Sequence, residues 1–218
     1  MNTESVVVQG YFVHIAALAD GEYSVRYTSR GLQHERGVGG RPKIVPQFEA
    51  RVRAGGPDSV TWTRKPADTA LEQARFDDDA RRRVRILHPW LKLLDGLIDM
   101  VKRWADELGW STKVIPKPMS DSEVGDYRAP ALLLQEGVTR ILLEPIARSA
   151  PGAQGVADLY LMPAYDDIAT LYYYDGKWHV HYAKPTDRVV ADTRAGESRP
   201  LTKARLRDVL AEMTSHAG

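Results

Sequence analysis

The segment from Val138 to Ala183 constrains the fold of this chain more than any other part of the sequence. It contains four apolar runs, each rich in the β-branched and aromatic residues that are enriched in β-strands. The runs are Val138–Ile146, Val156–Met162, Ala169–Tyr174 and Trp178–Ala183. Asp175-Gly176 separates the last two runs, and this dipeptide is typical of a tight hairpin turn. The segment therefore predicts an antiparallel β-meander.

Two helices are predicted to cover this meander. The first begins at Pro89, because proline is favoured in the first turn of a helix, and it ends at Gly109. Its apolar residues recur at helical spacing opposite its charged residues, which predicts a long amphipathic helix. The second lies at the C-terminus, where Thr202 is predicted to cap the first turn. We therefore expect an α+β fold, an antiparallel meander of about five to six strands packed against a long amphipathic helix and a C-terminal helix.

The first 65 residues are predicted to form a smaller β-rich section. Strand-like runs are separated there by glycine-containing turns such as Asp20-Gly21. The sequence thus predicts a β-rich section over residues 1–65 and an α+β main domain over residues 66–218.

A charged run lies in the helical segment that precedes Pro89. Three aspartates at residues 77–79 are followed by arginines at positions 81, 82, 83 and 85. Acidic residues before basic ones complement the dipole of a helix. We interpret the segment as a solvated helix, and an electrostatic contact surface is the alternative.

Composition excludes several classes of function. The chain has no cysteine, which excludes disulfides, thiol catalysis and cysteine-ligated metal sites. A net charge of +1 gives no indication of a nucleic-acid or membrane partner. The N-terminus lacks the features of a secretory signal, and no apolar run approaches the roughly 20 residues of a membrane span. We expect a cytoplasmic protein, and the excess of arginine over lysine suggests a bacterial one.

Strand alternation predicts which residues share the face of the meander opposite the helices. If the apolar faces pack on the helices, then Glu144, Asp158, Tyr160, His179 and His181 lie on that outer face. Histidine nitrogens and carboxylate oxygens are ligands for a divalent metal ion. Glu144 and Asp158 are therefore candidate catalytic residues, and His179 and His181 are candidate metal ligands. The alternative interpretation is a pair of histidines that merely point outward from a hairpin.

Two carboxylates on neighbouring strands partly resemble the core of the PD-(D/E)XK nucleases. Glu144 or Asp158 would supply the strand carboxylate, which implies a nuclease. The family pattern also requires an acid-X-Lys triplet, and no such triplet follows either residue.

Tyr165-Asp166-Asp167 is interpreted as an exposed turn. The alternative is general acid–base chemistry by Asp166 or Asp167 together with His179.

Tyrosines are concentrated in the same segment and predict a second kind of site. Tyrosine is favoured at protein interfaces because its rigid ring gives a large contact area at small entropic cost. We expect Tyr160, Tyr172, Tyr174 and Arg140 to bind a partner. The predicted function is a non-catalytic protein-interaction or accessory module with a protein partner and no cofactor. The alternative is a metal-dependent hydrolase or nuclease that uses a divalent metal ion.

Overall fold

The computed structural model describes residues 8, 10–29, 35–36, 42–43, 47–55, 59–65, 70–165, 167–182 and 198–216. The chain divides into two compact units. Unit 1 consists of residues 1–89 and 118–128, and unit 2 consists of residues 90–117 and 129–218. The division into a β-rich section over residues 1–65 and a main domain over residues 66–218 stays a prediction.

Unit 1 contains four antiparallel strands next to the first part of helix α1 (Ala70–Glu107). The strands are β1 (Tyr11–Ala17), β2 (Glu22–Ser29), β5 (Phe48–Arg53) and β6 (Val60–Arg64). A single 3-10 turn, η1 (Ala19–Gly21), joins β1 to β2, and β3 (Glu35–Arg36) pairs only with β4 (Pro42–Lys43). Phe76 of α1 lies among aromatic side chains, with its ring centroid 5.1 Å from that of Tyr27 and 5.4 Å from that of Phe48. This aromatic cluster forms the core of the unit.

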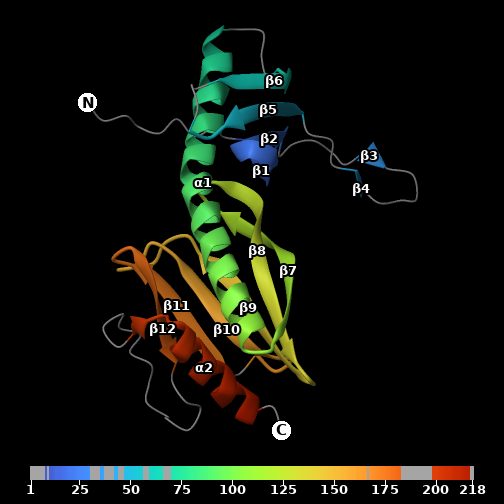
Figure 1. The fold of residues 1–218 in the computed structure, drawn as a ribbon. Helices are drawn as coiled ribbons and strands as arrows, with labels where there is room; N and C mark the ends of the chain where they lie inside the picture. The colour runs from blue at the N-terminus through green and yellow to red at the C-terminus, as the bar shows by residue number, and fades with distance from the viewer. Residues whose placement is uncertain are drawn as a thin grey trace. The chain divides into compact units, whose positions relative to one another are not determined.

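Unit 2 contains the predicted meander and both predicted helical segments (Figure 1). Its strands are β7 (Ser111–Asp121), β8 (Gly125–Glu136), β9 (Thr139–Ala147), β10 (Val156–Met162), β11 (Ile168–Tyr174), β12 (Lys177–Tyr182) and β13 (Arg199–Pro200), with the first residues of β8 and the last of β7 belonging to unit 1. From β8 to β13 each strand pairs antiparallel with the next. The antiparallel meander is confirmed.

The prediction of about five to six strands is wrong, because hydrogen bonding links eleven strands. One of these links joins β1 in parallel to the start of β8, where His14 lies opposite Asp126. Strand β7 continues through Pro116 and Pro118, which an edge strand tolerates because one side of its backbone needs no ladder hydrogen bond.

Helix α1 is longer than predicted. It runs for 38 residues, and Pro89 lies inside it instead of at its start. The helix therefore continues although proline cannot donate to the carbonyl four residues earlier. In unit 2 its buried residues recur every three or four positions, and they are Trp90, Leu91, Leu94, Leu97, Ile98, Val101 and Ala105. The amphipathic character of the whole helix stays a prediction.

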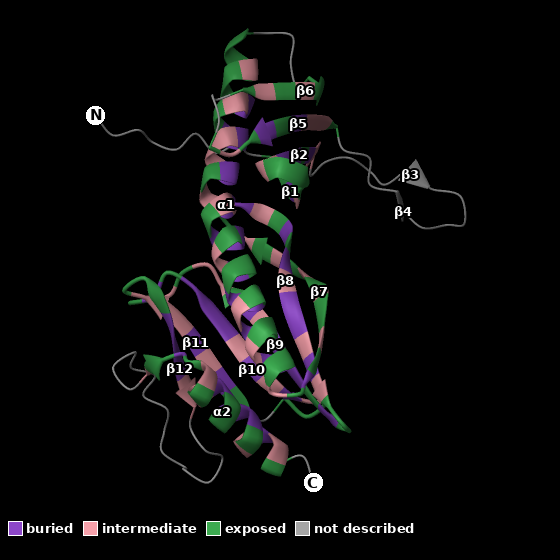
Figure 2. Ribbon diagram, in the orientation of Figure 1, coloured by how far each residue is buried: buried purple, intermediate pink, exposed green. Residues whose placement is uncertain are grey.

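Helix α2 (Lys203–Ser215) begins as predicted. The Thr202 hydroxyl accepts a hydrogen bond from the Arg205 amide at 3.2 Å, so the predicted N-cap is confirmed. In unit 2, α2 and the second half of α1 lie on the same face of the sheet, and the sheet residues on that face are buried (Figures 1 and 2). None of the helices in the described residues combines the length and apolarity needed to cross a membrane.

Candidate functional site

The face of β9–β12 away from α1 and α2 is the candidate site, and we call it the outer face. Gly155 marks the opposite, helix-covered face, because a Cβ at this glycine would lie 2.6 Å from Trp90 and 3.5 Å from Trp178. Residues that alternate with Trp178 along the strands, and their partners across the sheet, therefore form the outer face. They are Arg140, Leu142, Glu144, Asp158, Tyr160, Met162, Ile168, Thr170, Tyr172, Tyr174, Lys177, His179 and His181.

A polar row crosses this face from β9 to β12. The strand registers place Asp158 opposite Glu144 on one side and opposite Thr170 on the other. Thr170 in turn lies opposite His181. His179 lies two residues before His181 on β12, opposite Tyr172. The two candidate carboxylates are therefore neighbours, whereas the two candidate histidines belong to different rows.

Glu144 already has a cationic partner. The Nζ of Lys117 lies 2.9 Å from the Glu144 carboxylate and donates a hydrogen bond to the Pro145 carbonyl at 3.0 Å. Lys117 comes from β7, which pairs with β8 and not with β9. The ammonium group thus neutralises one of the two carboxylates of the row.

Asp158 is held in a less polar environment. The Tyr160 hydroxyl donates to its Oδ2 at 2.8 Å, while its Oδ1 is buried and has no hydrogen-bond partner among the described residues. Burial raises the pKa of Asp158, and the nearby Glu144 carboxylate raises it further, against the opposing effect of the Tyr160 and Thr170 hydroxyls. Burial and the bond to Asp158 also raise the pKa of Tyr160. Asp158 therefore holds a proton more readily than an exposed aspartate.

His179 is packed in the sheet. It is only 4% exposed, and its ring stacks on that of Tyr174 with centroids 3.7 Å apart and planes 6° from parallel. Its Nδ1 has no partner among the described residues. Burial, followed by the charge of Lys177, lowers the pKa of His179. The ring is therefore a neutral packing group in this structure.

No group of three or more histidine, aspartate or glutamate side chains in the described part of the chain is arranged to hold a metal ion. Glu144 and His179 have side chains that commonly bind metal ions. In this structure Glu144 pairs with Lys117, and His179 stacks on Tyr174. The metal-ligand assignment of His179 and His181 stays a prediction.

The predicted binding residues share the outer face, with Arg140 opposite Met162 at the end of β10 and Tyr172 opposite Val156 at its start. Tyr160, Tyr172 and Tyr174 are all partly exposed, and the Tyr160 ring lies 5.6 Å from that of Tyr165 at a steep angle. Arg140 is exposed at the far end of β9 and forms no ion pair with the described residues. The face thus combines accessible aromatic rings with a cation available to a partner.

A second polar cluster was not predicted from the sequence. The Asp167 carboxylate accepts hydrogen bonds from the Tyr182 hydroxyl at 3.0 Å and from His216 Nδ1 at 2.9 Å, and the residue is 4% exposed. The interpretation of Asp167 as part of an exposed turn is therefore wrong, and Asp166 lies outside the described residues. His216 follows α2, far along the chain, so no local pattern could have indicated this contact.

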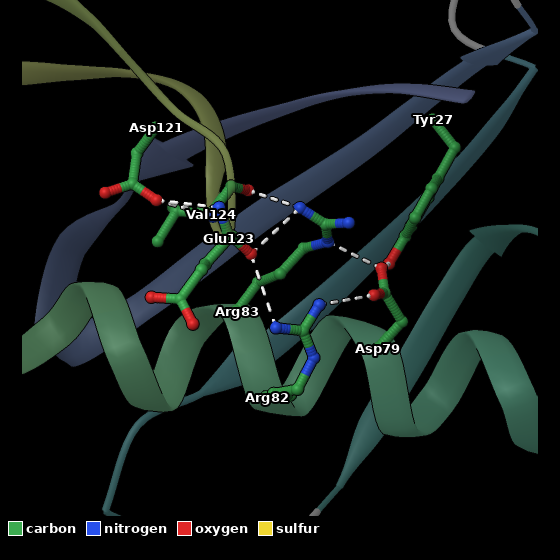
Figure 3. Close-up of polar contacts among 7 residues, drawn as sticks. All are labelled: Tyr27, Asp79, Arg82, Arg83, Asp121, Glu123 and Val124. Atoms are coloured by element: carbon green, nitrogen blue, oxygen red, sulfur yellow. Dashed lines mark hydrogen bonds and ion pairs between the residues drawn. The ribbon is translucent and has the colours of Figure 1, made fainter. Parts of the chain in front are cut away.

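In unit 1, Asp79 and Arg83 of the charged run belong to a buried network that Figure 3 shows. The Asp79 carboxylate accepts from Arg83 Nε at 2.6 Å and from the Tyr27 hydroxyl at 2.9 Å. Arg83 also donates to the carbonyls of Glu123 and Val124, in the turn between β7 and β8, at 3.2 and 2.8 Å. The interpretation of the run as a solvated helix is wrong for Arg83, whose charge holds the β7–β8 turn against α1.

Comparisons of the chain with protein-family models, with curated proteins and with solved structures found no match in any of the three sets. The function proposed below therefore rests on the geometry and chemistry of the described residues.

Proposed function

We propose that the protein is a non-catalytic binding module whose outer face binds a partner protein. One observation carries this proposal. The outer face presents Tyr160, Tyr172 and Tyr174 together with the exposed residue Ile168, on the side of the sheet opposite α1 and α2. Accessible aromatic and aliphatic groups gathered on one surface are typical of a protein-contact site.

The chemistry of the face defines the partner that it would bind. Tyrosine rings provide flat apolar area and pack well against aliphatic side chains. Arg140 lies on the same face near the start of β9, opposite Met162, and it would pair with a carboxylate of the partner. We therefore propose a protein partner that presents aliphatic residues next to an aspartate or glutamate.

The metal-dependent hydrolase or nuclease has weaker support from the same face. A metal ion at Glu144 and Asp158 would compete with the Lys117 ammonium, which lies 2.9 Å from Glu144. Titration with zinc or manganese in a calorimeter tests this second function. A stoichiometric heat that disappears in a Glu144→Gln variant would favour it over the binding module.

The binding module is tested with an Arg140→Glu/Tyr172→Ala variant. Val138→Ser is the matched control, because Val138 is 94% exposed at the β8–β9 turn and is not part of the outer face. Proteins captured from the native lysate by the wild type are purified, and their affinities for the three forms are measured by calorimetry. We expect at least a tenfold loss with the double variant, since central aromatic and arginine side chains commonly contribute more than about 1 kcal/mol.

The control variant should bind the captured protein with the wild-type affinity. Circular dichroism and the melting temperature establish that the double variant is folded. If every captured protein binds both variants equally well, the outer face is not the binding surface and the proposal fails.

The cytoplasmic location and bacterial origin, and a partner that is neither nucleic acid nor membrane, stay predictions from the sequence.

A further inference from the structure

Unit 2 contains a cavity on the helix-covered face of the sheet. Its volume is about 330 Å³, and it lies between the second half of α1, the β11–β12 hairpin and the residues that lead into α2. Tyr173 and Trp178 form one aromatic wall, with ring centroids 5.3 Å apart, and Leu93, Met100 and Leu201 contribute aliphatic surface. Tyr173 and Trp178 alternate with Tyr172 and His179, so this cavity is separate from the outer face.

Gly96 keeps the cavity open on the side of α1. A glycine in the interior of a helix is less stable than an alanine at the same position. No heavy atom would lie within 4 Å of a Cβ built at this glycine, so close packing does not require it. A side chain at position 96 would instead extend into the space that the cavity offers.

Two lysines border the cavity. Lys92 lies one helical turn before Gly96, whereas Lys177 is the first residue of β12, where the strand register places its side chain on the outer face with Tyr174. Lys92 is exposed and forms no ion pair with a residue that the structure describes. An apolar cavity with an unpaired ammonium group at its edge is complementary to an apolar molecule with a negative charge at one end.

We propose that this cavity binds a small apolar carboxylate. Its apolar body lies against Trp178 and Tyr173, and its carboxylate pairs with Lys92. The volume falls at the lower end of the roughly 300–1,000 Å³ that ligand pockets span, which suits a ligand of one or two rings or a short alkyl chain. This site is independent of the proposed protein-binding function of the outer face.

The test uses 2-naphthoate as the probe and 2-naphthalenemethanol as its uncharged counterpart. Binding is followed by the indole NMR signal of Trp178, assigned with a Trp178→Phe variant. We expect saturable binding of the naphthoate that is at least tenfold tighter than binding of the alcohol. The Lys92→Met variant should remove most of that preference, whereas Lys102→Met, a change of a helix lysine that does not line the cavity, should leave it intact.

Two substitutions at Gly96 separate filling of the cavity from effects on the helix. Both Gly96→Ala and Gly96→Leu should raise the helix stability, because glycine is the poorer helix former. Gly96→Ala should retain naphthoate binding, and Gly96→Leu should reduce it at least tenfold because the leucine side chain occupies the cavity.

Three results would each overturn the proposal. The first is a lack of saturation at naphthoate concentrations up to about 10 mM. A ligand with a dissociation constant of about 1 mM would nearly saturate the site at that concentration. The second is equal affinity for the acid and the alcohol. The third is undiminished binding to a folded Gly96→Leu variant.

Discussion

Replacement of Arg83 by methionine should destabilise unit 1 strongly. The side chains of Asp79 and Arg83 are 0% and 6% exposed, and their contact is 2.6 Å long. Methionine keeps much of the apolar length of arginine but leaves the Asp79 carboxylate buried without its closest cation. Removal of one partner of a buried ion pair costs about 3–5 kcal/mol.

Two further contacts decide where in this range the loss falls. Arg82 still donates to Asp79 Oδ1 at 3.0 Å, which reduces the loss. The Val124 carbonyl loses its 2.8 Å hydrogen bond from Arg83, which adds about 1 kcal/mol. We therefore expect a decrease of about 3–4 kcal/mol in the free energy of unfolding of unit 1.

Arg81→Met is the matched control on the same helix. Arg81 pairs with Asp78 at 3.1 Å, but these side chains are 27% and 76% exposed, so the change should cost less than about 1 kcal/mol. Unfolding in urea is followed by the indole NMR signal of Trp62, which lies in unit 1 and donates to Asp77 Oδ1 at 2.6 Å. This signal reports on unit 1 separately from the four tryptophans of unit 2.

A double-mutant cycle with Asp79→Asn gives the decisive result. If the two residues act as a buried pair, the double variant should lose at least about 1.5 kcal/mol less than the sum of the single losses. Additive losses, or an Arg83→Met variant as stable as Arg81→Met, would refute the inference that this pair holds the β7–β8 turn to α1.

Three other changes test particular features of the two units. Gly125→Ala should cost about 2 kcal/mol or more in urea unfolding, because the residue has φ +101° and its Cβ would lie 2.4 Å from the Val13 carbonyl oxygen. Asp158→Asn should stabilise the protein at pH 7. Because the pKa of Asp158 is raised, the folded state binds the proton before the unfolded state does, and wild-type stability rises as the pH falls through the folded pKa. The advantage of the variant in urea titrations should therefore be smaller at pH 4 than at pH 7. His179→Gln should show a smaller loss of stability between pH 7 and pH 5 than the wild type. The lowered pKa of His179 makes the unfolded state bind the proton first, so the wild type loses stability as the pH falls through the unfolded value of about 6.5.

The meander was predictable because its information is local. Asp175 and Gly176 have φ values of 51° and 73°, the positive values that the turn between β11 and β12 requires. Alternation then assigns each residue of the flanking strands to one face, as Trp178 and His179 show by packing on opposite sides of β12. A period of two and a turn dipeptide are enough to predict a hairpin.

Contacts between distant segments were not predictable in this way. The pairing of β1 with β8 joins His14 to Asp126, and no sequence period marks two strands as parallel neighbours. Arg83 belongs to a run that reads as exposed, since arginine is almost never buried unless it is paired. Asp79 comes from the same helix as Arg83, whereas Val124 lies in a turn about 40 residues away. Only the contact with Val124 requires the folded chain. Asp79 and Arg83 are four residues apart, a spacing that the sequence already showed to favour an ion pair on a helix.

The outer face shows the same distinction within one site. Alternation predicts that Glu144 and Asp158 share a face, but it gives no information about Lys117, which reaches Glu144 from β7. That lysine changes the chemistry of the row. With Glu144 neutralised, Asp158 is the carboxylate of the pair without a cation in contact, and burial rather than repulsion is the main cause of its raised pKa. A Lys117→Met substitution removes the competitor of a metal ion and should raise the pKa of Asp158 further. Metal binding that appears only in this variant would mean that Lys117 keeps the row free of metal and leaves the tyrosines as the functional part of the face.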